Sequence, residues 1–196
     1  MIILQKILHG IKGIKNMRVI SGKMRGTNLE SPKDRRVRPT TDRIKEDLFN
    51  IIMPYVGGSK VLDLFAGSGA IGIEAISRGC KKSYFVDNNM DSIRLIKRNI
   101  KKTKCEEESV VIKKDAVSFV NTTKEKFDVI FMDPPYNYEK LKNLIENIIK
   151  CDILCKDGIL IVEHDKNMPI GEYKNTVKIR TKSYSLTSID FFVLEE

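Results

Sequence analysis

Residues 61–72, with the sequence VLDLFAGSGAIG, constrain the fold more than any other stretch of this 196-residue chain. The apolar run at 61–65 is typical of a strand buried on both faces of a parallel sheet. Gly67 and Gly69 then predict a tight turn, because glycine adopts backbone angles closed to other residues and leaves room for a ligand. A helix to about Arg78 follows, and the free N–H groups at its start face the turn. We therefore expect a flat, polar ligand to lie on this turn.

The rest of the chain alternates strands with helices. Thr40, Thr41 or Asp42 can cap a helix that runs to Pro54, and further helices are expected at residues 90–101 and 141–149. Strands expected at 83–86, 109–113, 127–132 and 158–163 favour a parallel sheet with right-handed crossovers. Strands at 177–180 and 189–194 have no helix between them and should pair antiparallel at one edge. The predicted fold class is α/β: a mostly parallel seven-stranded sheet with helices on both faces and an antiparallel C-terminal hairpin.

The length of the chain predicts a single domain, which we place at residues 17–196. Residues 1–16 are separable from it, because their apolar side chains would line one face of a helix with lysines elsewhere. One interpretation is a basic amphipathic helix at a membrane or RNA surface. The favoured one is a disordered extension that an upstream start codon adds before Met17.

Positive charge is concentrated at the front of the chain. Residues 1–43 hold 11 Lys and Arg against 3 acidic residues, whereas the other 153 residues hold 24 against 23. Such asymmetry favours a polyanionic partner, nucleic acid first. In the basic segment at 17–43 the cations are mixed with Gly, Ser and Thr, which suits contacts with phosphate and sugar. The candidate RNA-binding residues are Arg18, Lys23, Arg25, Arg35, Arg36, Arg38 and Arg43.

Several function classes are disfavoured by composition. No run of 18 apolar residues occurs, and the first residues lack the basic region of a signal peptide. The four cysteines show no CxxC spacing and lack the partners of a zinc site. We therefore expect a cytoplasmic protein with reduced cysteines, no membrane association and no bound metal.

Acidic residues follow or interrupt the predicted strands. Gly67 to Gly72 match G-x-G-x-x-G and Asp87 ends the next strand, a pattern that also fits a nicotinamide-dinucleotide site. The Asp87 carboxylate can accept hydrogen bonds from both hydroxyls of a ribose, or it can cap the next helix. Asp115 is either a solvated loop residue or an acceptor for an adenine amino group. Asp63 lies within its strand and must find donors near the turn, since burying it unsatisfied is costly.

The sequence Asp133-Pro134-Pro135-Tyr136 follows the strand at 127–132, at the edge where open α/β sheets bind ligands. Two successive prolines fix the backbone and remove two N–H donors. The neighbouring carbonyls and the Asp133 carboxylate then form a rigid cluster of acceptors beside an aromatic ring. Such a cluster suits a planar group with an amine, which donates to Asp133 and the Pro134 carbonyl while Tyr136 stacks on the ring. A simple proline turn is the alternative.

These motifs are similar to those of class I methyltransferases, which use S-adenosylmethionine and here would modify exocyclic amines of bases. From Met17 almost to its end, the chain resembles the bacterial 16S rRNA guanine-N2 methyltransferases of the RsmD type. The motifs that carry the resemblance are Arg18-Val19-Ile20-Ser21-Gly22, Arg25-Gly26, Arg38-Pro39-Thr40-Thr41-Asp42-Arg43, Leu48-Phe49-Asn50, Phe65-Ala66-Gly67-Ser68-Gly69, Glu74-Ala75, Ser77-Arg78-Gly79 and Asp133-Pro134-Pro135-Tyr136. The Asp-Pro-Pro-Tyr motif is shared with DNA amino-methylases, whereas the Arg-Pro-Thr-Thr-Asp-Arg block is far more specific.

The resemblance implies a Rossmann-like fold and methyl transfer from S-adenosylmethionine, with S-adenosylhomocysteine as product. The target would be the exocyclic N2 of a guanine in 16S rRNA, guanine 966 in the family, modified during small-subunit biogenesis. The implied catalytic residues are Asp133, Pro134, Pro135 and Tyr136. The implied cofactor-binding residues are Asp63, Phe65, Ala66, Gly67, Ser68, Gly69, Asp87, Asn88, Asp115, Ala116 and Thr41. Among them, Asp87 would hold the ribose and Asp115 the adenine.

The implied partner is 16S rRNA or the assembling 30S subunit, and we expect the protein to be a monomer. A DNA adenine-N6 or cytosine-N4 methyltransferase is the alternative enzyme, although the chain shows no separate base-reading domain. A dinucleotide-dependent oxidoreductase leaves the Asp-Pro-Pro-Tyr motif unexplained. A non-catalytic RNA-binding module predicts that Asp133→Ala changes no activity.

Overall fold

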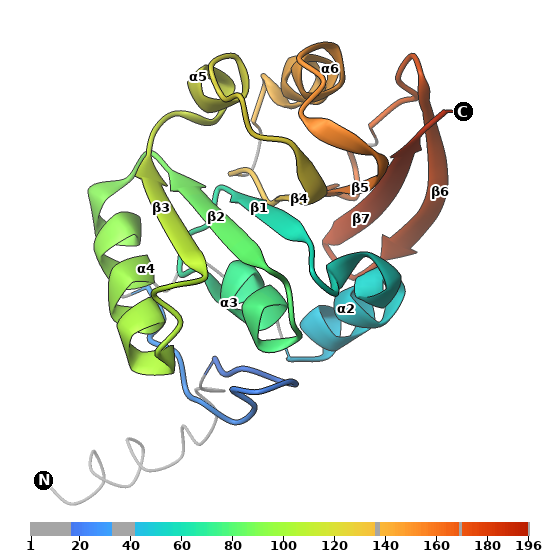
Figure 1. The fold of residues 1–196 in the computed structure, drawn as a ribbon. Helices are drawn as coiled ribbons and strands as arrows, with labels where there is room; N and C mark the ends of the chain where they lie inside the picture. The colour runs from blue at the N-terminus through green and yellow to red at the C-terminus, as the bar shows by residue number, and fades with distance from the viewer. Residues whose placement is uncertain (1–16, 33–41, 136–137, 169, 196) are drawn as a thin grey trace, which may run out of the picture.

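The computed structural model describes residues 17–32, 42–135, 138–168 and 170–195. A seven-stranded sheet with the order β3-β2-β1-β4-β5-β7-β6 runs through its centre (Figure 1). The strands are β1 (Lys60–Leu64), β2 (Lys82–Asp87), β3 (Ser109–Lys113), β4 (Phe127–Met132), β5 (Leu154–Asp165), β6 (Thr176–Ser183) and β7 (Thr187–Leu194). The helices are α2 (Asp42–Val56), α3 (Ala70–Ser77), α4 (Met90–Thr103), α5 (Ala116–Val120) and α6 (Leu141–Lys150).

The direction of the strands confirms the predicted fold class. β1 pairs in parallel with β2 and β4, β2 with β3, and β4 with β5. β7 pairs antiparallel with both β5 and β6, which forms the expected C-terminal hairpin. Two details differ from expectation: β5 begins at Leu154, ahead of Gly158, and the short helix α5 was not predicted, because five residues are too few for a helical pattern to appear.

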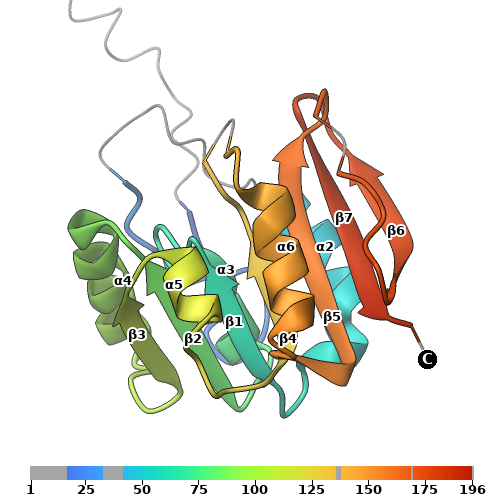
Figure 2. The ribbon, with the colours of Figure 1, turned by 90° about the horizontal axis from the view of Figure 1, so that it is seen from above.

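Helices cover both faces of the sheet. In Figures 1 and 2, α5 and α6 lie on one face and α2, α3 and α4 on the other. Side chains of the central strands alternate between two cores: Val61 and Val129 pack with the residues of α2, α3 and α4, whereas Leu62 and Ile130 pack with those of α5 and α6. Both faces of β1 and β4 are therefore buried, which explains their nearly continuous apolar sequences.

A basic hairpin, residues 17–29, precedes α2 and docks on α3. Arg18 and Asn28 form an antiparallel bridge, which joins the two arms of the hairpin. The backbone N–H of Lys23 donates to the carbonyl of Ser77 over 2.8 Å, and that of Met24 donates to the Ser77 hydroxyl over 2.9 Å. Four of its apolar side chains join the core beside α2 and α3: Met17, Val19, Met24 and Leu29.

No helix in the described ranges is both long enough and apolar enough to cross a bilayer.

Gly22 sets how closely the hairpin approaches α3, and Gly22→Ala tests this. A Cβ atom on Gly22 would lie 1.8 Å from the carbonyl oxygen of Ser77, whereas one on Gly26 would meet no atom within 4 Å. Both glycines have positive φ angles, +81° and +84°, so the two alanine variants carry similar backbone strain. We expect Gly22→Ala to lower the free energy of unfolding by about 1–3 kcal/mol more than Gly26→Ala. Urea unfolding measures both, and equal losses would contradict the tight contact.

Candidate active site

The turn after β1 takes the left-handed conformation that its glycines predict. Phe65, Gly67 and Gly69 have φ angles of 69°, 54° and 77°. Phe65 tolerates this conformation because its N–H and that of Ala66 both donate to the carbonyl of Val86 over 3.0 Å. Ser68 is half-buried, and its carbonyl accepts from the Asn99 side chain over 2.9 Å. The turn is thus fixed between β2 and α4.

The third glycine of the pattern has a packing role. A Cβ atom on Gly72 would lie 2.3 Å from the ring of Phe85 and 2.6 Å from the Ser83 hydroxyl, so only glycine allows α3 to approach β2 this closely. The N–H of Gly72 also donates to the Asp63 carboxylate over 3.0 Å, which supplies the donor that this buried acid was expected to need. Burial, and to a lesser extent the charge of Asp87, still raises the pKa of Asp63 to about 7.

Asp87 joins the turn to the end of β2. Its Oδ2 accepts from the N–H of Gly67 over 2.9 Å, and its Oδ1 accepts from the N–H of Asn89 over 2.8 Å. Each carboxylate oxygen has a second lone pair, so the group can still accept two further hydrogen bonds. The capping alternative for Asp87 is wrong, because Asn89 caps α4: its side-chain oxygen accepts from Asp91 and Ser92. Asn88 lies exposed beside Asp87.

Asp115 lies just beyond β3 and caps α5, a role that neither sequence interpretation included. Its Oδ1 accepts from the N–H of Ser118 over 3.0 Å. Ala116 begins α5 and is buried. Acidic side chains therefore lie at the carboxyl ends of β2 and β3, on the edge of the sheet that also carries the glycine turn. A ligand with one group of hydrogen-bond donors near the end of β2 and another near the end of β3 fits these two acidic side chains.

The sheet places Asp133 directly beside the glycine turn. Leu64 of β1 pairs with Met132 of β4, so Phe65 and Asp133 are the next residues on neighbouring strands. The ring of Phe65 also contacts that of Tyr138, with centroids 5.2 Å apart and planes at 74°. Asp133 and the turn at 67–69 thus share one edge of the sheet, the arrangement on which the predicted chemistry depends.

Asp133, Pro134 and Pro135 line a pocket of about 330 Å³. Asp133 is exposed to solvent as a residue. The surrounding protein nevertheless desolvates its carboxyl group, which raises the pKa of Asp133 well above the ordinary value. The nearby carboxyl groups of Glu163 and Asp63 raise this pKa further, since like charges disfavour ionisation. The pocket floor therefore favours ligands that bring a positive charge or hydrogen-bond donors.

His164 lines the same pocket, yet both ring nitrogens face other protein groups. Its Nδ1 lies 2.9 Å from the carbonyl of Asp165 and its Nε2 lies 3.3 Å from the Asp190 carboxylate. Burial opposes the charge of Asp190, but hydrogen bonds from His164, Thr181 and Lys178 outweigh it and lower the pKa of Asp190 to about 2. These contacts tie β5 to the C-terminal hairpin, so His164 acts in structure and not as a base.

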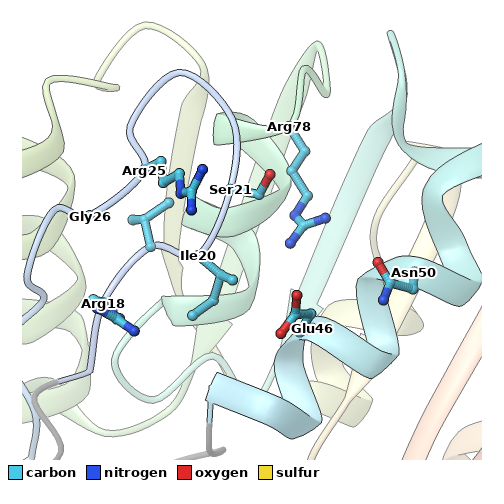
Figure 3. Close-up of a pocket in the computed structure, with 9 residues that line it drawn as sticks. Arg18, Ile20, Ser21, Arg25, Gly26, Glu46, Asn50 and Arg78 are labelled. Atoms are coloured by element: carbon cyan, nitrogen blue, oxygen red, sulfur yellow. The ribbon is translucent and has the colours of Figure 1, made fainter.

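A second pocket, of about 400 Å³, lies between the basic hairpin, α2 and the end of α3. Arg18, Arg25 and Arg78 surround it, and Glu46 and Asn50 on α2 face them (Figure 3). Arg18 pairs with Asp42 over 3.0 Å, while Arg25 forms no ion pair within the described ranges. Lys23 lies outside this pocket and pairs with Glu108 over 2.5 Å, and Arg43 is exposed on α2.

The buried carboxylate of Glu74 fixes the wall of this second pocket. It accepts hydrogen bonds from the backbone N–H groups of Ile20 and Ser21 at 2.8 and 2.9 Å. It also pairs with Lys45 over 3.1 Å and with Arg78 over 2.8 Å, and all three side chains are nearly inaccessible to solvent. Burial lowers the pKa of Lys45 although Glu74 opposes this shift. We call these three residues the Glu74 cluster.

Five predicted site residues lie outside the part of the chain that the structure describes. Their proposed roles stay predictions: Thr41 at the cofactor, Tyr136 at the target base, and Arg35, Arg36 and Arg38 at the RNA, together with the extension at 1–16. Conversely, the sequence analysis missed Lys45, Tyr138 and Glu163. Glu163 carried a usable signal, since it is an acidic residue at the end of a predicted strand, as Asp87 is.

The strand order, the glycine turn after β1 and the acids at the ends of β2 and β3 define the class I methyltransferase fold. A solved structure from Escherichia coli, "Putative methyltransferase yhhF", matches with a TM-score of 0.83 and 27% identity, covering 92% of this chain and 98% of that one. A family model described as "Conserved hypothetical protein 95" matches residues 17–193. The chain belongs to this family.

Curated relatives confirm the resemblance to the RsmD type. The chain is 39% identical over 180 residues to "Putative rRNA methyltransferase YlbH" of Bacillus subtilis, covering 90% of this chain and 98% of the relative. It is 34% identical over 175 residues to "Ribosomal RNA small subunit methyltransferase D" of Haemophilus influenzae, covering 88% of this chain and 91% of the relative.

Removing the Glu74 carboxylate should destabilise the fold strongly. Glu74→Gln leaves Lys45 and Arg78 buried without a counter-ion, which costs about 3–5 kcal/mol of unfolding free energy. Glu46→Gln is the matched control, because Glu46 is exposed on α2 beside the same pocket and its loss should change stability by about 0.5 kcal/mol or less. Urea unfolding compares the two variants. A small loss for Glu74→Gln would show that the cluster does not hold the hairpin.

Proposed function

We propose that this protein transfers a methyl group from S-adenosylmethionine to the exocyclic N2 of a guanine in 16S rRNA. The observation that carries the proposal is the pairing of Leu64 with Met132, which sets Asp133 beside the glycine turn. The family's guanine 966 is the proposed target, modified during assembly of the small subunit. The names of the curated relatives support an rRNA substrate.

The residues around the turn fit S-adenosylmethionine. Asp87 has acceptors left for both ribose hydroxyls, and Asp115 lies at the end of the next strand, where an adenine amino group would follow. Phe65, Ala66 and the glycine turn would contact the methionine part, with Asp63 behind them. The bound cofactor supplies an electrophilic methyl group on a sulfonium, and the acidic edge of the sheet favours that positive charge.

Asp133 and the carbonyl of Pro134 hold the amine in this proposal. The lone pair of the guanine amine is delocalised into the ring, so the protein must align the nitrogen and favour its pyramidal form. Two fixed acceptors do both, because they bind the two amine hydrogens and stabilise the positive charge that develops on nitrogen. Proline at 134 and 135 keeps the acceptors rigid and removes competing N–H donors. The proton lost from the amine goes to Asp133 or to solvent.

The basic hairpin is the proposed RNA contact. Arg18 and Arg25 offer guanidinium groups at a pocket of about 400 Å³, and Arg43 and Lys23 extend the positive surface. Such contacts position the RNA backbone, whereas the base is read in the pocket at Asp133. Because the target base must leave its stack to reach that pocket, a loop nucleotide suits this site.

Labelled S-adenosylmethionine and small subunits from an unmodified strain test the proposal. We expect label on a single guanine of 16S rRNA, and we expect Asp133→Ala to lower kcat by about 100-fold to 1000-fold, the typical cost of one fixed electrostatic contact. Asp128→Ala is the matched control: Asp128 lies on the same strand but binds the N–H of Lys60 at the opposite end. Label on duplex DNA instead of rRNA would favour the DNA methyltransferase alternative.

The raised pKa of Asp133 predicts an unusual acid limit for the reaction. A protonated carboxyl group loses an acceptor for the amine, so kcat/KM should fall as the pH drops through this raised pKa, well above the ordinary value of 3.8. The pH dependence of kcat/KM for S-adenosylmethionine measures the free enzyme's ionisation. Rates that stay constant down to the ordinary pKa of aspartate would show that an ionised Asp133 is not required.

A further inference from the structure

The pocket at Asp133 contains a second carboxyl group for which the proposed mechanism has no role. Met132 of β4 pairs with Val162 of β5, so Asp133 and Glu163 are the next residues on adjacent parallel strands. Backbones of such strands lie about 4.8 Å apart, which sets the two side chains next to each other. Both line the pocket, together with Pro134, Tyr138, Met168 and Thr187.

One oxygen of Glu163 is buried and unused. Its Oε2 has no hydrogen-bond partner among the residues that the structure describes, although the Thr187 hydroxyl binds the same carboxyl group. Folded proteins leave few buried polar atoms unpaired, because each costs the full desolvation penalty of the group. An unpaired acceptor in a pocket beside the proposed catalytic acid therefore indicates that a ligand supplies the missing donor.

We infer that Glu163 accepts a hydrogen bond from N1–H of the target guanine while Asp133 holds its N2 amine. This inference rests on the proposed function and explains how the site would select its base. The Watson–Crick edge of guanine carries two adjacent donors, N1–H and the N2 amine, and two adjacent carboxyl groups match them. Asp133 alone would bind any exocyclic amine.

The second acceptor would exclude other amino bases. Adenine and cytosine carry a ring nitrogen with a lone pair next to the amine, which a carboxylate repels. A site that leaves buried polar groups unpaired discriminates strongly against such a base. Burial raises the pKa of Glu163, whereas the Thr187 hydroxyl and the charge of His164 oppose this rise. A donor such as N1–H, bound to the free oxygen, would stabilise the carboxylate further. Tyr184 also lies within reach of its charge.

Reconstituted small subunits with either guanine or 2-aminopurine at the modified position test this role. 2-Aminopurine keeps the amine at C2, but its N1 is an acceptor. Wild-type protein should prefer guanine, and Glu163→Gln should lower kcat/KM for guanine by about 10-fold to 100-fold. The rate with 2-aminopurine should stay constant or rise, because the glutamine amide can donate to N1. The ratio of the rate with guanine to the rate with 2-aminopurine should therefore decrease in Glu163→Gln. A purely structural role of Glu163 would not change this ratio.

Two further variants complete the experiment. Glu139→Gln removes an exposed carboxylate from the same pocket and should leave the ratio at its wild-type value. Glu163→Asp keeps an acceptor and should retain most of the guanine preference. Thermal unfolding and S-adenosylmethionine binding of Glu163→Gln check that the fold and the cofactor site are intact. Equal losses on both RNAs, or no loss, would overturn the role of Glu163 alone. A wild-type protein that methylates neither RNA would overturn the proposed function as well.

Discussion

Parallel pairing between β1 and β4 is the interaction on which the candidate site depends. In the sheet, β2 and β3 lie on one side of β1, whereas β4 and β5, which come later in the chain, lie on its other side. The loops that leave β1 and β4 consequently diverge, the arrangement at which open α/β sheets bind ligands. Pairing of Leu64 with Met132 fixes the register, and a slip of one residue would turn Asp133 away from the turn.

The same edge of the sheet gathers carboxyl groups that repel one another. Asp63, Asp133 and Glu163 follow or lie within three neighbouring strands, and the pKa of each is raised. Burial is the first cause in all three cases, and neighbouring negative charge adds to it for Asp63 and Asp133. The protein holds these groups at a cost in stability, which a cationic cofactor and a base with two donors would relieve. The fold thus places carboxyl groups with raised pKa values at the site where the proposed chemistry needs acceptors.

Sequence patterns predicted those residues of the site that lie at the carboxyl ends of strands. An apolar run followed by Asp marks the carboxyl edge of a parallel sheet, which is how Asp87 and Asp133 were found, and Glu163 obeys the same rule without having been singled out. The glycine turn was predictable because its backbone conformation requires glycine at 67 and 69. Asp115 was placed at the correct edge, but its capping of α5 was not, because a five-residue helix shows no periodicity.

The Glu74 cluster shows why other parts could not be predicted. Its members come from α2 and the end of α3, and the hairpin binds Glu74 through backbone N–H groups. No local pattern connects Ser21, Lys45 and Glu74 before the chain is folded. A buried ion pair alone is weak evidence for stability, since desolvation offsets much of the attraction. Here the carboxylate also accepts two backbone N–H groups of the hairpin, which fixes the hairpin's orientation as well as its position. In the proposed function, an RNA bound to Arg18 and Arg25 would therefore meet the sheet in one orientation, and that geometric constraint would offset the cost of burying charge at this place.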